Sequence, residues 1–412
     1  MAAWPTKRMD QLCEITSSKR IFAADYVSEG VPFYRGREVT EKYKGNLDVS
    51  TELFITEEKF AEIERKFGAP KLGDLLLTSV GTLGSVYVVK PGDRFYFKDG
   101  NLTWFRNFKG LDSQFLFYWI GSPQGKAELQ KCTIGSSQSA FTIVLLKGIE
   151  IALPPMPVQQ RIATILSAYD ELIENSLRRI KILEAMARGL YREWFVHFRF
   201  PGHENHLRVA SALGEIPRGW EVVAFTDLAD VLSGGTPKTD MPEYWNGDIP
   251  FFTPKDAPSC FYVEDAERHV TELGLSKCAS ALYEPDTVFI TARGTVGKVA
   301  MPSVPIAMSQ SCYALRGKHG CTQRFLFLMT VQQVDYLKTN TGGATFDTIV
   351  VDTFRRMKVV KPPFDLIANF SAKVGALLEQ VKVLQRQVRN LRRTRDLLLP
   401  RLLSGQINVE AP

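Results

Sequence analysis

The histidines and cysteines, whose side chains most often bind metals or act as nucleophiles, are few and dispersed. The chain has five histidines and six cysteines. His197, His203 and His206 lie together in the polar stretch VHFRFPGHENH, which we expect to be a solvated loop rather than a zinc site. No two cysteines have the CxxC spacing, so we expect reduced thiols that are mostly buried.

Glycine-rich stretches at 81–84 (GTLG) and 294–297 (GTVG) are the next candidates for chemistry, because such loops can hold phosphates. The P-loop pattern GxxxxGK[ST] fails here, since Gly297-Lys298 is followed by Val299. The sequence also lacks GxGxxG after a strand, GxSxG and HExxH. We therefore predict that both stretches are turns between strands.

Two double prolines, Pro154-Pro155 and Pro362-Pro363, come close to the [DNS]PP[YF] motif with which amino-methyltransferases hold a DNA base. In that motif the polar first residue binds the target amino group and the aromatic residue stacks on the base. Here the first residue is Leu153 or Lys361, and neither can accept a hydrogen bond from an exocyclic amine. We therefore predict that these prolines join a strand to a helix and have no catalytic role.

The composition is that of a soluble globular protein with more than one domain. The chain has 412 residues, of which 45% are hydrophobic and 23% charged. No run approaches the roughly 20 apolar residues that span a bilayer, and the N-terminus lacks the layout of a signal peptide. We expect a cytoplasmic protein without a membrane partner. The net charge of +6 permits a polyanionic partner without requiring one.

The segments that would position a functional site are duplicated in the sequence. Trp4 and Trp220 lie 216 residues apart, GTLG and GTVG lie 213 apart, and the double prolines lie 208 apart. Each half begins with short strand-like runs, aromatic residues and Gly/Pro turns, interrupted by helix-like stretches such as SQFLFYWIGS. We predict a mixed α+β fold: a tandem duplication of a globular α/β domain, each copy followed by a long helix.

A long helix is expected after each double proline. Apolar residues recur there at alternating steps of three and four, which indicates a coiled-coil seam. The predicted seam residues are Leu166, Ile173, Ile180, Leu183, Leu190, Leu377, Val381, Leu384, Val388, Leu391 and Leu398. The alternative is that each stripe packs only on its own domain.

Two equivalent halves would pair their helices about a pseudo-twofold axis, and such an axis makes the pair antiparallel. Arg395, a charge in the seam near the end of the second helix, would then lie near the start of the first. Asp170, Glu171 and Glu174 supply carboxylates there. We predict a contact between Arg395 and this acidic cluster; the alternative is that Arg395 extends into solvent.

The stretch LSGGTPKTDMPEYWNGDIPFFTPKD (232–256), together with TARGTVGKV (291–299) and the double proline before each helix, resembles the specificity (S) subunit of type I restriction-modification systems. The resemblance covers essentially the whole chain. The first half departs from the pattern, because TSSKRIFAADYVSEGVPFYRGREV lacks the Gly-Gly-Thr-Pro and Tyr-Trp-Asn-Gly elements.

The resemblance implies a subunit without an active site or cofactor of its own. It implies two target-recognition domains, each reading one half of a split double-stranded DNA sequence, and an antiparallel helix pair that sets the gap between the half-sites. Two methyltransferase (M) subunits and endonuclease/translocase (R) subunits are the implied partners. The expected boundaries are 1–155 and 213–362 for the recognition domains, 156–198 and 363–405 for the spacer helices, 199–212 for a linker and 406–412 for a tail.

Loops that project from each domain are the natural carriers of DNA contacts, since Lys and Arg reach phosphates while Asn, Gln, Ser and Thr can read base edges. The candidates in the second domain are Thr236, Lys238, Thr239, Lys255, Arg293 and Thr295. Those in the first domain are Arg35, Arg37, Thr82, Lys98, Ser136, Ser137 and Gln138. The alternative is that the threonines cap turns and the charged side chains only solvate the surface.

The second helix also carries a run of basic side chains that could face DNA, an acidic partner or solvent. Its members are Lys382, Arg386, Arg389, Arg392, Arg393, Arg395 and Arg401.

Two other functions stay open from the sequence. The chain could be a self-contained DNA methyltransferase or nuclease with an unrecognised active site, or a scaffold that binds only proteins. Turnover by the purified chain alone would favour the enzyme, and DNA affinity that does not respond to salt would favour the scaffold.

Overall fold

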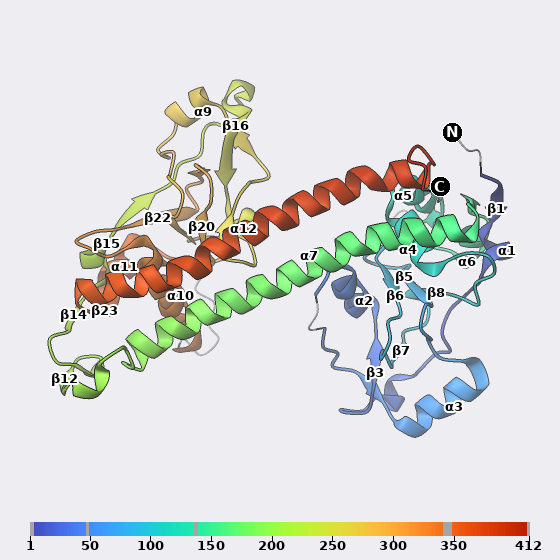
Figure 1. Ribbon diagram of the computed structural model, residues 1–412, viewed down its shortest axis with the longest axis horizontal. Helices are drawn as coiled ribbons and strands as arrows, with labels where there is room; N and C mark the ends of the chain where they lie inside the picture. Colours follow the sequence, from blue (N-terminus) through green and yellow to red (C-terminus); the bar gives the residue numbers. More distant parts are fainter. Residues whose placement is uncertain (1–3, 47–48, 136–138, 341–347, 410–412) are drawn as a thin grey trace. The chain divides into compact units, whose positions relative to one another are not determined.

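The computed structural model describes residues 4–46, 49–135, 139–340 and 348–409. They form two compact units: unit 1 comprises Met1–Glu174 and Arg389–Pro412, and unit 2 comprises Asn175–Val388. Two helices, α7 (Met156–Tyr191) and α12 (Phe364–Leu403), are the longest in the described chain and contribute to both units (Figure 1). None of the helices in these ranges is both long and apolar enough to cross a membrane.

Unit 1 is a mixed α/β domain built mainly on a four-stranded antiparallel sheet. Its strands are β1 (Thr6–Arg8), β2 (Glu14–Thr16), β3 (Val31–Tyr34), β4 (Phe54–Ile55), β5 (Leu75–Thr78), β6 (Val86–Val88), β7 (Tyr96–Phe97), β8 (Leu102–Arg106), β9 (Thr133–Ile134), β10 (Ala140–Phe141) and β11 (Glu150–Ala152). Its helices before α7 are α1 (Met9–Leu12), η1 (Ala23–Asp25), α2 (Gly36–Tyr43), α3 (Glu57–Phe67), α4 (Ser113–Gly121), α5 (Pro123–Lys131) and α6 (Ile143–Lys147).

Unit 2 repeats this plan with longer strands. Its strands are β12 (Arg208–Ser211), β13 (Gly214–Pro217), β14 (Glu221–Ala224), β15 (Ala229–Ser233), β16 (Trp245–Phe252), β17 (Tyr262–Val263), β18 (His269–Val270), β19 (Val288–Thr291), β20 (Val299–Pro302), β21 (Ala307–Met308), β22 (Cys312–Gly317) and β23 (Lys358–Lys361). Its helical segments besides α7 and α12 are η2 (Arg192–Val196), η3 (His203–Asn205), α8 (Phe225–Leu228), η4 (Pro242–Tyr244), η5 (Pro254–Asp256), α9 (Glu272–Ser276), α10 (Gln323–Asn340) and α11 (Val351–Arg356).

The strand order confirms the predicted duplication. Unit 1 has the order β2-β8-β5-β6, and unit 2 has β15-β22-β19-β20 followed by β17. A second small sheet in each unit contains one parallel pair, β3 with β7 and β16 with β21. The first and last strands of each domain also pair with one another, β1 with β11 and β14 with β23. The fold is therefore a mixed α+β domain that occurs twice.

The double prolines join a strand to a long helix, as predicted. The carbonyl of Pro155 accepts hydrogen bonds from the backbone N–H groups of Val158 and Gln159 at 2.9 and 3.1 Å. The carbonyl of Pro363 does the same for Leu366 and Ile367, at 3.1 and 3.2 Å. Proline lacks an N–H, which a first helical turn does not need, so it starts a helix without losing a hydrogen bond.

Each unit pairs one end of α7 with the opposite end of α12. In the core of unit 1, Ile162 and Leu166 from the start of α7 belong to one cluster with Leu402 and Leu403 from the end of α12. In the core of unit 2, residues from the end of α7 cluster with residues from the start of α12, Tyr191 with Phe370 among them. The two helices therefore run antiparallel.

The helices also pack on the domains, so the two interpretations of the apolar stripe describe one arrangement. Phe325 of α10 lies 5.7 Å from Tyr191, centroid to centroid, in the same cluster as the helix ends. Among the predicted seam residues, those that are buried are Leu166, Ile173, Ile180, Val381, Leu384 and Val388. Those that are half-buried are Leu183, Leu190, Leu377, Leu391 and Leu398.

Arg395 contacts Asp170 of the acidic cluster in the first half of α7, which confirms the prediction drawn from its place in the seam. Its Nη1 lies 2.5 Å from Oδ1 of Asp170, and its Nη2 lies 2.8 Å from Oδ1 of Asp396. Burial lowers the pKa of the guanidinium, but the two carboxylates outweigh it and the pKa of Arg395 is raised. The arginine is therefore held as a cation within unit 1.

Candidate nucleic-acid interface

The GTLG and GTVG stretches are twin turns with the same hydrogen bonds. The hydroxyl of Thr78 accepts from the N–H of Ser85 at 2.8 Å, and that of Thr291 accepts from Lys298 at 2.9 Å. Both glycines of each stretch have positive φ, from 75° to 83°, which glycine adopts without strain. The prediction of turns between strands is confirmed, since the stretches join β5 to β6 and β19 to β20.

The twin turns present polar side chains to solvent. Thr82 is exposed in unit 1, and Arg293, Thr295 and Lys298 are exposed in unit 2. The backbone N–H of Arg293 donates to the carbonyl of Ser311 at 3.2 Å. Within the described ranges, the Arg293 guanidinium forms no ion pair or hydrogen bond. The backbone of this arginine is therefore anchored while its charge stays available.

The short helix η5 brings Lys255 next to the unit 2 turn. A Cβ placed on Gly294 would lie 3.8 Å from Cβ of Pro254, the first residue of η5. The carboxylate of Asp256 accepts from the N–H and hydroxyl of Thr253 at 2.8 and 2.6 Å, so it closes the turn internally. Lys255 is exposed beside it. Lys255 and Arg293 thus extend from two adjacent turns.

The GGTPKT stretch approaches unit 2 so closely that side chains would not fit. A Cβ on Gly234 would lie 2.2 Å from the carbonyl oxygen of Ser309, and one on Gly235 would lie 2.5 Å from the N atom of Ala279. The stretch then emerges at the surface, where Thr236 is half-buried and Lys238 and Thr239 are exposed. The two glycines are therefore needed for packing, and the polar residues after them are free to contact a ligand.

The candidates of unit 1 are more involved in internal contacts. Arg35 Nη2 lies 3.2 Å and Arg37 Nε lies 3.0 Å from Oε1 of the fully buried Glu38. Burial raises the pKa of Glu38, but hydrogen bonds from Arg35 and Arg37 outweigh it, and the pKa is lowered. Lys98 is half-buried, with its N–H donating to Tyr34 at 2.8 Å. Ser136, Ser137 and Gln138 lie outside the described residues.

The basic run of α12 is divided between buried, paired and exposed side chains. Lys382 is only 8% exposed and is paired with Asp286, because the helix buries this face against unit 2. Arg386 lies 3.6 Å from a carboxylate oxygen of Glu264, and Arg395 is bound by Asp170. Exposed members include Arg392, Arg393 and Arg401.

Two exposed residues near the unit 2 turn, Lys298 and Gln310, were not among the candidates predicted from the sequence. Lys298 follows Gly297 directly, so its position in the turn was a sufficient signal. Gln310 precedes Ser311, whose carbonyl binds the N–H of Arg293, and no sequence pattern links positions so far apart. The histidines of the linker are bound to backbone carbonyls, His203 Nδ1 to Phe200 at 2.8 Å and His206 Nδ1 to Gly202 at 3.2 Å.

The chain thus contains one mixed α/β domain twice, each copy with a long helix and with a polar turn that faces solvent. A family model described as "Type I restriction modification DNA specificity domain" matches residues 1–185 and again 217–378. The chain therefore belongs to the family of type I restriction-modification specificity subunits.

Relatives that are named specificity subunits of type I restriction enzymes align with most of this chain. The chain is 28% identical over 429 residues to the type I restriction enzyme MjaIX specificity subunit of Methanocaldococcus jannaschii, covering 99% of this chain and 94% of that protein. It is 24% identical to the HindI specificity subunit of Haemophilus influenzae, covering 82% of this chain and 87% of that protein. The crystal structure of the S subunit from M. genitalium has the same fold, with a TM-score of 0.59, 18% identity, and coverage of 97% and 96%.

Proposed function

We propose that the chain reads a bipartite DNA target and has no catalytic activity of its own. Residues 1–155 and 213–362 act as two target-recognition domains. Residues 156–198 and 363–405 form the spacer that sets the gap between half-sites, joined by a linker at 199–212 and followed by a tail at 406–412. The supporting observation is the twin turn: each domain holds the same hydrogen-bonded hairpin with exposed polar side chains at its tip.

The chemistry of the unit 2 turn suits a DNA duplex. Arg293, Lys255 and Lys298 are exposed cations on adjacent turns, and cations supply phosphate contacts and guanine recognition. Thr236, Thr239 and Thr295 offer hydroxyls that can donate to or accept from base edges. The rigid turns beneath them reduce the ordering cost of binding.

The partners proposed are double-stranded DNA, two methyltransferase (M) subunits and endonuclease/translocase (R) subunits, in the cytoplasm. Methyl donor, ATP and magnesium would be bound by those subunits. Support comes from the relatives, whose names describe specificity subunits of type I restriction enzymes. Among the described residues no group of three or more His, Cys, Asp and Glu side chains could hold a metal ion.

Mapping adenine methylation in the host genome tests this function directly. Deletion of this gene should remove methylation from one split sequence motif and leave other motifs unchanged. A host whose methylated motifs are identical with and without the gene would contradict the proposal.

Two assays on the purified chain separate the alternatives. Methylation or cleavage of DNA in the presence of methyl donor, ATP and magnesium, without added subunits, would favour a self-contained enzyme. Retention on duplex DNA should weaken steeply as salt rises, because the contacts release condensed counterions. Binding that is indifferent to salt would favour a protein scaffold.

A further inference from the structure

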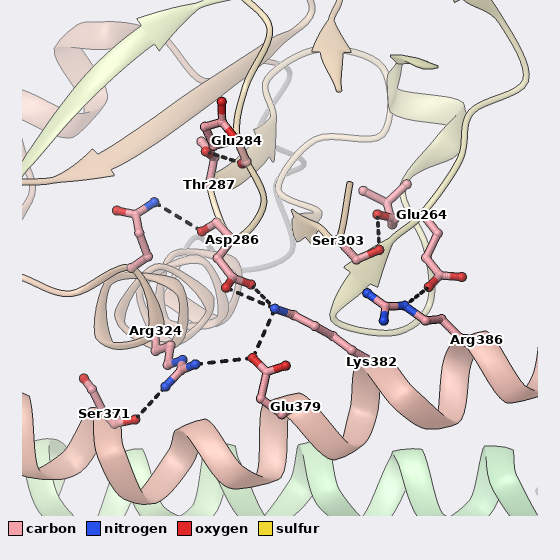
Figure 2. A network of polar contacts seen from close by, with 12 residues as sticks. Glu264, Glu284, Asp286, Thr287, Ser303, Arg324, Ser371, Glu379, Lys382 and Arg386 are labelled. Atoms are coloured by element: carbon pink, nitrogen blue, oxygen red, sulfur yellow. Dashed lines mark hydrogen bonds and ion pairs between the residues drawn. The ribbon is translucent and has the colours of Figure 1, made fainter. Parts of the chain in front are cut away.

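A buried lysine fastens α12 to the recognition domain of unit 2. Lys382 Nζ lies 2.8 Å from Oδ1 of Asp286, in the loop before β19, and 3.2 Å from Oε1 of Glu379 (Figure 2). The same Glu379 oxygen lies 3.3 Å from Nη2 of Arg324 on α10. We call these four residues the lysine clasp. Because the Lys382 side chain is only 10% exposed, its charge depends on these carboxylates rather than on water.

In unit 1 the recognition domain contacts α7 through different side chains. The hydroxyl of Tyr118 on α4 donates to Oδ2 of Asp170 at 2.6 Å, and Arg395 binds the other carboxylate oxygen. One helical turn further on, Glu174 lies 3.8 Å from Nζ of Lys90. We call Tyr118, Asp170, Lys90 and Glu174 the aspartate clasp. Burial and the hydrogen bond to Asp170 both raise the pKa of Tyr118, so this phenol stays a donor.

The two clasps occupy equivalent positions of the duplicated fold. At the 208-residue offset of the double prolines, Asp170 corresponds to Leu378 and Glu174 corresponds to Lys382. On the domain side, the 210-residue offset between QFLF and RFLF places Leu328 where unit 1 has Tyr118. Leu328 and Leu378 are 2% and 0% exposed and share one apolar cluster. A polar pair in unit 1 is thus replaced by an apolar pair in unit 2.

The charges of the second contact are reversed between the units. Lys90 directly follows Val89, whose carbonyl accepts from Gly73 at 3.0 Å. In unit 2 the equivalent bond joins the N–H of Asp286 to the carbonyl of Pro302 at 2.9 Å. Asp286 therefore stands beside the place that Lys90 has in unit 1. At this contact the helix residue is acidic and the domain residue basic in unit 1, whereas in unit 2 Lys382 is the helix residue and Asp286 the domain residue.

If each recognition domain docked on the helix of the other unit, the side chains of the two clasps would meet like charges or apolar groups. Domain 1 on α12 would bring Lys90 to Lys382 and leave the Tyr118 hydroxyl against Leu378. Domain 2 on α7 would bring Asp286 to Glu174 and set Leu328 against Asp170. Unpaired buried polar groups and like charges each oppose such docking.

We propose that the two clasps determine which helix each recognition domain pairs with at this position, so that each domain docks here on the helix that follows it. The apolar contacts of each domain with the other helix are shared by both units and do not discriminate. Two copies of one fold with similar apolar surfaces are prone to exchange between molecules, and polar mismatch is a means to prevent it. The inference concerns docking alone, so it is tested without DNA and its outcome is independent of the proposed function.

The first experiment reverses one contact in the full-length chain and follows amide hydrogen exchange in β19 and α10. Lys382→Glu should speed exchange at least tenfold, an estimate from the cost of breaking a buried pair. The double variant D286K/K382E should return exchange to within about threefold of the parent chain, because the ion pair is restored with opposite polarity. Lys373→Glu, the same charge change at an exposed position of α12, is the control and should have no effect. Failure of the double variant to recover would overturn the proposal.

The second experiment tests whether the clasps determine the helix on which a domain docks or only stabilise the docked domain. In the variant E174K/K382E the charged contact on each helix has the charge of the other helix, so at this contact each domain matches the helix that it does not follow. Analytical ultracentrifugation should show a shift to higher mass, since exchange between chains becomes favourable. Adding K90E and D286K should reverse that shift. Faster exchange without any change in mass would show that the clasps only stabilise, and the proposal would be rejected.

Discussion

At the scale of single residues, Glu184 is a buried carboxyl whose ionisation should affect the stability of unit 2. It lies on α7, is 6% exposed, and its Oε1 accepts a hydrogen bond from the N–H of Phe261 at 2.6 Å. Burial raises the pKa of this carboxyl to about 7, although the Phe261 N–H and Arg188 favour the charged form. A carboxyl that ionises near neutral pH therefore lies where α7 meets the recognition domain.

Unit 2 should lose stability as pH rises from about 4.5 to about 7. Below pH 4.5 Glu184 is protonated in both the folded and the unfolded chain. Between pH 4.5 and 7 the carboxyl is ionised in the unfolded chain but still protonated in the folded chain, and this difference favours unfolding. The pKa difference corresponds to roughly 3 kcal/mol at pH 8. Glu184→Gln keeps the acceptor for Phe261, so it should flatten the pH dependence and raise the thermal midpoint at pH 8. Glu272→Gln, at an exposed position, is the control. Equal pH profiles for E184Q and the parent chain would refute this role.

Arg293 should contribute to DNA affinity through one phosphate or base contact. Arg293→Ala in the assembled complex should weaken binding about 5- to 100-fold, and the slope of log affinity against log salt should fall by about one if the contact is to phosphate. Fluorescence anisotropy over a salt series measures both quantities. Arg218→Ala removes an exposed arginine elsewhere in unit 2 and is the matched control. Identical affinities for R293A and R218A would exclude Arg293 from the interface.

At the scale of elements, the helix pair depends on polar contacts as well as on apolar packing. Asp170 binds Tyr118 of the domain and Arg395 of α12, so one carboxylate connects three elements of unit 1. The side chains of Asp170 and Arg395 are about one third exposed, which leaves part of their attraction screened by water.

Asp170→Asn should lower the free energy of unfolding of unit 1 by about 1–3 kcal/mol, since two charge-assisted hydrogen bonds lose their acceptor charge. A double-mutant cycle with Arg395→Gln should show a coupling energy above about 0.5 kcal/mol. Hydrogen exchange at the start of α7 reports the change. Glu171→Gln, an exposed neighbour, should leave exchange unaltered. Additive effects of D170N and R395Q would show that the ion pair is not coupled.

At the scale of the whole molecule, the two duplicated domains share one strand topology but differ in the polar side chains on their surfaces. In unit 2, Lys255 and Arg293 extend freely from adjacent turns. In unit 1, the positions of Arg35 and Arg37 are engaged by a buried glutamate. We expect the two domains to recognise unrelated half-sites.

Substitutions in one domain should therefore relax specificity in one half of the target only. Arg293→Ala should broaden the bases accepted in one half-site, while Thr82→Ala should act on the other, because each residue belongs to a different reader. Selection of bound sequences from a randomised duplex library by the assembled complex measures this. A single variant that relaxes both half-sites would contradict independent reading.

The sequence by itself determined the duplication, the twin turns, the helix starts and the antiparallel helix pair. Each depends on local chemistry: proline restricts the helix start, glycine permits positive φ, and apolar spacing along a helix defines the buried face. The contact of Arg395 with Asp170 was predicted from the same spacing, with extension of Arg395 into solvent as the alternative.

Only the tertiary structure decided which cations are available. Lys382 and Arg392 lie ten residues apart on one helix, yet the first is buried against Asp286 and the second is exposed. Arg35 and Arg293 both adjoin a turn, but a buried Glu38 engages only the first. Availability depends on partners far away in sequence, and spacing along the chain carries no information about them.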